Sequence, residues 1–213
     1  MHTLYIPDGH RRYAQKHKIS LEEAYAKGGE NIARIIKWLS KKGVSDISIF
    51  ILAEHNLNRR EEEVLAIAKG ARYVIEHYFI TDPEIMKFKF DVVTTEEGGL
   101  VSKVKAHFLE IAEATKDNDE TRVNFLVGYS GETEVTTALE SNPQTYRELV
   151  GLSRLKPIDI IIRAGPIIRL SESPILPIHK NTAFFATRNL NPEVTTKDLK
   201  KILEDYRRHG NQT

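Results

Sequence analysis

The stretch Leu4–Gln15, "LYIPDGHRRYAQ", joins a short apolar run to the start of a polar segment through Pro-Asp-Gly. The run Leu4–Ile6 is typical of a buried strand, and the Pro and Gly that follow end it. Asp8 therefore comes directly after the strand, and Arg11 and Arg12 fall on the first turn of the next segment. The stretch predicts a strand, a polar loop and a helix in close succession.

Four more short apolar runs are predicted to be buried strands: Ile47–Leu52, Phe88–Val93, Val123–Val127 and Ile158–Ile162. Other segments carry apolar residues at helical spacing with helix start or stop signals: Glu22–Gly43, Arg60–Phe79, Leu100–Asp117 and Thr195–Gly210. Strands that alternate with helices of this length predict an α/β fold, a mostly parallel central sheet flanked by helices. The segment Pro166–Pro177 has no such pattern and is predicted to be a loop.

Composition narrows the class of protein. A chain of 213 residues can bury one substantial core, so residues 1–213 are predicted to form a single domain. Acidic and basic residues nearly cancel, 30 against 31, which gives no reason to expect a nucleic-acid partner. The absence of Cys excludes thiol catalysis and fits a reducing compartment. The longest apolar run, Ile47–Ala53, is too short to span a bilayer, and no signal peptide is present, so a cytoplasmic protein is expected.

The loop after the first strand has the residues of an anion site. Backbone N–H groups at a helix N-terminus favour anions, and arginines donate bidentate hydrogen bonds, so Gly9, Arg11 and Arg12 could hold a phosphate. Asp8 would repel that phosphate unless a divalent cation lay between them, and Mg²⁺ bound through one carboxylate and substrate phosphates resolves the conflict. The alternative is that Asp8 caps the helix and the arginines are solvated.

Two more polar segments follow predicted strands. After the second strand come His55, Asn56 and Arg59, with Glu63 on the next helix. Asn56 can orient an oxygen and Arg59 can bind a phosphate, although such a segment is also typical of an exposed helix start.

After the fifth strand, Arg163 and Arg169 bracket a Gly-Pro turn, and Ser171 follows. Two arginines, a hydroxyl and a Gly that allows close backbone approach favour a second anion site.

These three motifs, in this order and spacing, resemble those of the cis-prenyltransferase family, which includes undecaprenyl diphosphate synthase. "DGHRRYA" resembles Asp-Gly-Asn-x-Arg-(Trp/Tyr)-Ala, and "AEHNLNRREEE" resembles in part Ser-x-Glu-Asn-Trp-x-Arg-Pro-x-x-Glu. "RAGPIIRLS" is similar to the family's Arg-(Thr/Ser)-Gly-Gly/Glu-x-x-Arg-x-Ser. The resemblance covers almost the whole chain and implies an enzyme that transfers prenyl groups from prenyl diphosphates.

The resemblance also implies roles for individual residues. Asp8 would be the Mg²⁺-binding catalytic aspartate, with Asn56 and Tyr25 as further catalytic residues. The diphosphates would be bound by Gly9, His10, Arg11, Arg12, Arg59, Arg163, Arg169 and Ser171, and Glu63 matches a position of the second motif. The segment Arg208–Gly210 resembles an Arg-x-Gly that reaches the active site in homodimers, so a homodimer is expected.

Several positions depart from the family pattern. His10 replaces the usual Asn; Leu21 and Tyr25 stand where an Arg and a His usually serve the allylic diphosphate; and Ile167 and Thr182 stand where acidic residues are usual. The Tyr and the form of the third motif are similar to the irregular branch of the family, such as cyclolavandulyl diphosphate synthase, which joins prenyl units in non-head-to-tail ways. Tyr25 would then act as a proton acceptor or as a ring that stabilises a cation, or would simply pack.

The expected function is therefore the Mg²⁺-assisted ionisation of an allylic prenyl diphosphate, with a short and irregular isoprenoid product. One alternative is a terpenyl transferase, cyclase or phosphatase in which water or another acceptor captures the cation; another is a non-catalytic subunit of a heteromeric enzyme. An apolar sleeve for the prenyl chain is expected between the sheet and the helices carrying Ile32–Leu39 and Val64–Ile75. A lipid product predicts peripheral contact with a membrane.

Overall fold

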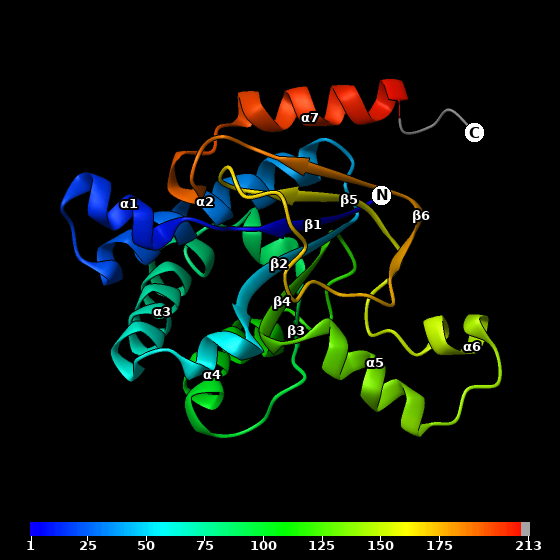
Figure 1. Ribbon diagram of the computed structural model, residues 1–213. Helices are drawn as coiled ribbons and strands as arrows, with labels where there is room; N and C mark the ends of the chain where they lie inside the picture. The colour runs from blue at the N-terminus through cyan, green and yellow to red at the C-terminus, as the bar shows by residue number, and fades with distance from the viewer. Residues whose placement is uncertain (210–213) are drawn as a thin grey trace.

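The structure, a computed structural model, describes residues 1–209. Six strands form one sheet in the order β3-β4-β2-β1-β5-β6, and each pairing within this range is parallel (Figure 1). The strands are β1 (His2–Ile6), β2 (Asp46–Ala53), β3 (Lys89–Val93), β4 (Arg122–Tyr129), β5 (Ile158–Arg163) and β6 (Ile178–Ala186). Strands β2, β1 and β5 are neighbours at the centre of the sheet, so the loops that follow them converge at one edge.

Within the described part of the chain, seven helices accompany the sheet: α1 (His10–His17), α2 (Leu21–Lys41), α3 (Glu61–Val74), α4 (Gly99–Ala114), α5 (Gly131–Glu140), α6 (Tyr146–Gly151) and α7 (Thr196–His209). Short helical turns are η1 (Glu54–Asn58), η2 (Ile75–Phe79), η3 (Ile85–Lys87) and η4 (Asn191–Glu193). In Figure 1, α1, α2 and α3 lie together on one side of the molecule, α7 runs across the top, and α5 and α6 lie at the opposite lower corner.

The core has two parts, one on each face of the sheet. The larger part packs the apolar stripes of α2, α3, α4 and α7 against inward side chains such as Ile49 and Phe125. The smaller part contains Leu126, Tyr129 and Ile161 from the other face. The continuous apolar runs of the central strands are therefore explained, because both faces of a parallel sheet are covered.

The predicted fold class is confirmed, since a parallel sheet flanked by helices is observed and all five predicted strands are present. The predicted helix Arg60–Phe79 starts at Glu61 and changes to a π-helical turn at Ile75. Strand β6 and helices α5 and α6 were not predicted. Strand β6 lies at the sheet edge, and none of its nine residues is fully buried. Its apolar run Ala183–Ala186 is preceded by the polar residues His179–Thr182, which obscure the strand signal.

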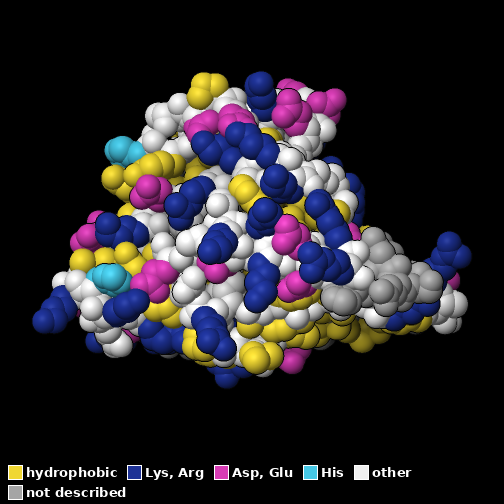
Figure 2. All heavy atoms as spheres, turned by 90° about the horizontal axis from the view of Figure 1, so that it is seen from above, with side chains coloured by type: hydrophobic (Ala, Val, Ile, Leu, Met, Phe, Trp, Pro, Cys, Tyr) yellow, Lys and Arg dark blue, Asp and Glu magenta, His cyan; other side chains and the backbone are white. Residues whose placement is uncertain are grey.

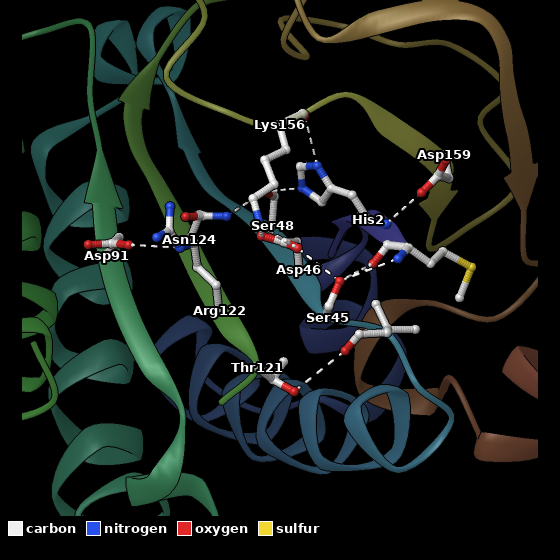
Figure 3. Close-up of polar contacts among 12 residues, drawn as sticks. His2, Ser45, Asp46, Ser48, Asp91, Thr121, Arg122, Asn124, Lys156 and Asp159 are labelled. Carbon is white, nitrogen blue, oxygen red and sulfur yellow. Dashed lines mark hydrogen bonds and ion pairs between the residues drawn. The ribbon is translucent and has the colours of Figure 1, made fainter. Parts of the chain in front are cut away.

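A polar cluster closes the amino-terminal edge of the sheet. His2, Ser48 and Asn124 point toward one another from β1, β2 and β4 (Figure 3). Asn124 donates to the Ser48 hydroxyl at 3.2 Å, and His2 Nε2 lies 2.8 Å from the same oxygen. His2 Nδ1 lies 2.9 Å from the carbonyl oxygen of Lys156, which can only accept, so Nδ1 carries the proton. The buried imidazole is thus hydrogen-bonded in its neutral form.

This arrangement predicts a pH-dependent stability. Burial lowers the pKa of His2, despite the opposing contact with the Lys156 carbonyl. The unfolded chain therefore binds the proton first, and stability falls as pH drops below about 6.5. Between pH 6.5 and 5, the unfolding free energy of the wild-type protein should fall more steeply than that of His2→Gln. The two slopes should differ by up to about 1.4 kcal/mol per pH unit. Urea unfolding across this range tests the idea, and equal slopes in both proteins would contradict it.

Charges on the outer surface are mixed. On the face that carries α7, Lys and Arg side chains are interspersed with Asp and Glu (Figure 2). Ion pairs such as Lys37–Asp82 and Lys41–Glu84 match this pattern. Among the described helices, none combines the length and the apolar character needed to cross a membrane.

Candidate active site

A buried ion pair joins the ends of β1 and β5. Ile6, the last residue of β1, pairs with Arg163, the last residue of β5. The Pro-Asp-Gly turn that follows β1 therefore begins beside Arg163. Arg163 Nη2 lies 2.8 Å from Asp8 Oδ2, and Arg12 Nη2 lies 3.3 Å from Oδ1. The Arg163 side chain is 6% exposed and that of Asp8 is 27% exposed. A buried guanidinium is tolerated here because the carboxylate compensates its charge.

The carboxyl group of Asp8 is held in its ionised form. Burial alone would raise its pKa, but the hydrogen bond and charge of Arg163, together with the charge of Arg12, lower it. Asp8 is therefore an ionised carboxylate between two guanidinium groups at the mouth of the site. This geometry contradicts the alternative in which Asp8 is a simple helix cap, since Gly9 occupies the N-cap position and no side chain caps α1.

Arg163 also organises the loop that follows β5. Its Nη1 donates to the carbonyl oxygen of Arg169 at 2.7 Å and to the hydroxyl of Ser171 at 3.0 Å. Ser171 adopts a positive φ of 54°, and Gly165 has a φ of 86°. A Cβ at Gly165 would lie 3.1 Å from Arg12 Nη2, so this glycine lets the first and third motifs approach. The Arg163 Nε is buried without a hydrogen-bond partner.

The second motif faces the same space from η1. The side-chain oxygen of Asn56 is buried and has no hydrogen-bond partner. His55 Nδ1 lies 2.7 Å from Glu172 Oε1, which links η1 to the loop after β5. Glu63, at the start of α3, has its Oε2 3.7 Å from Arg11 Nη1, and this buried oxygen has no hydrogen-bond partner. The unpaired amide oxygen is the kind of group that a bound ligand would satisfy.

Two rings from α1 and α2 lie against each other beside these polar groups. The rings of His10 and Tyr25 have centroids 4.7 Å apart at a tilt of 32°. Burial lowers the pKa of His10 to about 4, against the opposing effect of Asp8. Burial raises the pKa of Tyr25, although the charges of Arg59 and Arg11 oppose it. Both rings are neutral near pH 7, which disfavours Tyr25 as a phenolate base and favours its use as a neutral ring or hydroxyl donor.

A cavity of about 460 Å³ connects these groups. Its polar end contains each of the eleven residues predicted to be catalytic or to bind diphosphate: Asp8, Gly9, His10, Arg11, Arg12, Tyr25, Asn56, Arg59, Arg163, Arg169 and Ser171. Its apolar part is lined by side chains of α2, α3, η2, α4 and β4, namely Ile32, Ile67, Ala71, Val74, Ile75, Phe79, Phe108 and Phe125. The apolar part lies where the sleeve was expected.

Some residues of the sequence prediction do not line the cavity. Glu63 does not line the cavity, although it forms an ion pair with Arg11, which does. Thr182 donates to the carbonyl oxygen of Ile158, the first residue of β5, so it lies at the opposite end of that strand from Arg163. Within one chain, a side chain at position 182 is therefore remote from Asp8. In the predicted Arg208–Gly210 motif, Gly210 is outside the described residues.

Sequence reasoning missed other contributors to the site. Phe79, Phe108 and Phe125 form the aromatic part of the cavity wall, with Phe108 and Phe125 centroids 4.5 Å apart. Asn191, which is fully buried, contacts His10 from the far end of the chain. The phenylalanines lie in apolar patterns that predict only core, and nothing near Asn191 in the sequence points to the first motif.

The family described as "Putative undecaprenyl diphosphate synthase" matches residues 6–213. A dehydrodolichyl diphosphate synthase of Encephalitozoon cuniculi is 31% identical, over 97% of this chain and 70% of the relative. A geranylgeranyl-diphosphate-specific tritrans,polycis-undecaprenyl-diphosphate synthase of Pyrobaculum aerophilum is 27% identical, over 97% and 92%.

Among solved structures, lavandulyl diphosphate synthase from Lavandula x intermedia, in complex with dimethylallyl diphosphate, is similar with a TM-score of 0.82. The match covers 97% of this chain and 94% of that one at 20% identity, which shows a shared fold.

Proposed function

The chain belongs to the undecaprenyl diphosphate synthase family of prenyltransferases, and on this basis we propose that it ionises an allylic prenyl diphosphate and transfers the prenyl group to an isoprenoid acceptor. The observation that carries the proposal is the position of Asp8, between Arg12 and Arg163 at the mouth of a cavity whose interior is apolar. The arginines suit a diphosphate and the interior suits a hydrocarbon chain.

Mg²⁺ is the proposed cofactor, and the donor set fits it. Among residues 1–209, no three His, Asp or Glu side chains come together to enclose a metal ion. One carboxylate beside diphosphate-binding arginines suits Mg²⁺, which is commonly held by one or two carboxylates plus substrate phosphates. Asp8 would hold the ion, and the bound ion would neutralise charge on the departing diphosphate.

The arginines of the site would share that task. As the C–O bond of the allylic diphosphate breaks, negative charge grows on the leaving oxygens, and preorganised guanidiniums stabilise it. Arg12 and Arg59 line the cavity with Arg169, and the unpaired oxygen of Asn56 can accept a hydrogen bond from a ligand. The apolar wall excludes water, which would otherwise capture the allylic cation.

We place the chain in the irregular branch of the family as part of the same proposal. Tyr25 and His10 replace a His and an Asn of the regular pattern, and the two tilted rings pack against each other at the cavity wall. Neutral aromatic rings can stabilise a nearby cation without becoming covalently attached to it. The similar lavandulyl diphosphate synthase structure holds dimethylallyl diphosphate, a short allylic substrate that the present cavity would accommodate.

The proposed assembly is a homodimer. Six of the nine large apolar side chains that are exposed among the described residues lie on α5, on α6 or directly after it, and on the loop after β5: Leu139, Tyr146, Leu152, Ile168, Leu170 and Ile175. Apolar exposure concentrated on neighbouring elements favours contact with a second copy. The proposed location is the cytoplasm, with peripheral membrane contact by which a lipid product would leave.

Product analysis tests the proposed function. The purified chain is incubated with Mg²⁺ and dimethylallyl, geranyl or farnesyl diphosphate, with and without isopentenyl diphosphate, and products are identified by mass spectrometry. Branched or cyclic products support the irregular branch, and regular products formed only with isopentenyl diphosphate would replace it by ordinary elongation. Alcohols formed without an isoprenoid acceptor would indicate capture by water. No turnover by the chain alone would favour a non-catalytic subunit.

The phenylalanine wall should limit the product. Phe125 pairs with Ile49 in the middle of the strands, so the cavity reaches from the sheet edge to mid-sheet, where Phe79 and Phe108 also line it. Phe79→Leu replaces a ring of the cavity wall by a smaller side chain and so lengthens the apolar space. We expect products longer by about one isoprene unit. Mass spectrometry of the products gives the chain length. Leu39→Val, which changes a core side chain that does not line the cavity, should leave the product unchanged.

A further inference from the structure

Asn191 is a fully buried residue that joins segments distant in the sequence. Its backbone N–H donates to the carbonyl oxygen of Asp8 at 2.9 Å. Its side-chain oxygen accepts from the Tyr5 hydroxyl at 2.8 Å. Its side-chain nitrogen lies 3.1 Å from the carbonyl oxygen of Gly28 and 3.0 Å from His10 Nε2. Asn191 therefore connects η4 with β1, α1 and α2 through its side chain and with the turn that carries Asp8 through its backbone.

The orientation of this amide follows from its partners. A backbone carbonyl can only accept, so the group of Asn191 that faces the Gly28 oxygen must be the NH₂. The amide oxygen then faces the Tyr5 hydroxyl, which can donate. A flipped amide would bring two acceptor oxygens together in a buried site, which costs free energy.

The oriented amide decides which imidazole nitrogen of His10 carries the proton. The second N–H of the Asn191 NH₂ points at Nε2, so Nε2 accepts and the neutral ring carries its proton on Nδ1. His10 Nδ1 has no hydrogen-bond partner among residues 1–209. It is not fully buried, so a ligand can reach it. The accessible space beside His10 is the cavity that its side chain lines.

The imidazole is also confined by its neighbours. A Cβ at Gly28 would lie 2.1 Å from His10 Nε2, so only glycine leaves room for the ring at this point of α2. The Tyr25 ring packs beside it, with centroids 4.7 Å apart. The ring is therefore held by packing as well as by the amide, and the direction of its free N–H is set.

We propose that Asn191 is a positioning residue, which holds His10 as the Nδ1–H tautomer so that this N–H donates to an oxygen of the substrate diphosphate. The inference rests on the proposed function for its ligand and on the Asn191 contacts for its geometry. A preorganised N–H aimed at an anionic oxygen contributes more in a water-excluded site than in solution.

Nitrogen-15 NMR of histidine-labelled protein tests the geometry without an assay of turnover. The His10 ring signals are assigned by their loss in His10→Phe. We expect a protonated Nδ1 and an unprotonated Nε2 in the free protein, and a shift of Nδ1 when inorganic diphosphate and Mg²⁺ are added. A protonated Nε2 would overturn the proposal. Diphosphate that binds, by calorimetry, without moving Nδ1 would overturn it while leaving the proposed function intact. No binding of diphosphate would overturn both.

Kinetics separates positioning from simple stability. Asn191→Ala should lower kcat/KM for the allylic diphosphate about tenfold, and the same change in a His10→Phe background should lower it less than about twofold. Asn118→Ala is a matched control, because the Asn118 amide also donates to two backbone carbonyls, those of Met86 and Phe88, away from the cavity. Equal losses for Asn191→Ala in both backgrounds, or an equal loss in the control, would overturn the positioning role.

Discussion

Replacing Asp8 with Asn should lower turnover of an allylic diphosphate by about 10³-fold. The substitution keeps the shape of the side chain and an oxygen for the Arg163 hydrogen bond, but it removes the negative charge that would hold Mg²⁺. Arg12 and Arg163 would remain near the diphosphate. The loss should therefore fall on kcat more than on KM, since the missing stabilisation belongs to the charge that develops as the bond breaks. Steady-state kinetics with a mass-spectrometric assay measures both.

A matched control is available at the other edge of the sheet. Asp46 is a buried carboxylate that pairs with Lys156 at 3.0 Å, and it does not line the cavity. Burial alone would raise the pKa of Asp46, but hydrogen bonds from Lys156 and Ser45 outweigh it and lower the pKa. Asp46→Asn should therefore destabilise the protein but retain activity. If Asp8→Asn retained more than a tenth of wild-type turnover, the proposed role of Asp8 would be wrong.

Replacing Arg163 with Met should produce the largest loss of stability, about 3 kcal/mol in the free energy of unfolding. The side chain of Arg163 is almost completely buried, and it binds Asp8, the Arg169 carbonyl and Ser171. Met fills similar space but leaves the Asp8 carboxylate without its closest cation and frees the loop after β5. Urea unfolding monitored by circular dichroism gives the difference.

The double variant separates the charge effect from the packing effect. In an Asp8→Asn background, the neutral amide no longer needs a cation, so Arg163→Met should cost at least about 1 kcal/mol less than in the wild-type background. Equal costs in the two backgrounds would mean that the Asp8–Arg163 pair contributes nothing beyond packing. A total loss below about 1 kcal/mol for Arg163→Met would contradict the description of this pair as a buried ion pair.

Most elements of the fold could be predicted because their signals are local. The apolar run of β2 and the apolar stripe of α2 are visible in the order of residues, since burial on both faces of a strand or on one side of a helix repeats at short range. Strand β6 could not be predicted in this way, because none of its nine residues is fully buried and polar residues occupy its first half. Helix α6, with six residues, is too short for a stripe to be recognised.

The site was predictable for a different reason. Loops after parallel strands meet at one edge of the sheet, so Asp8, Asn56 and Arg163 could be expected to lie together once the sheet was inferred. The strand order β2-β1-β5 was needed to make them neighbours. The sequence could not indicate that Arg163 binds Asp8 at all, because that contact joins residues 155 positions apart and depends on the register of Ile6 against Arg163.

Local patterns in the sequence were enough to predict the central strands and helices, and they also contain the three polar motifs that resemble those of a family and suggest its chemistry. Tertiary structure alone decided which charges are paired, which amide oxygen is left unsatisfied, and that Asn191 lies against His10, 181 residues away. The physical reason is that helix and strand periodicity arises from neighbours along the chain. Hydrogen-bond partners in the core are instead selected by register and close packing, which depend on all the segments at once.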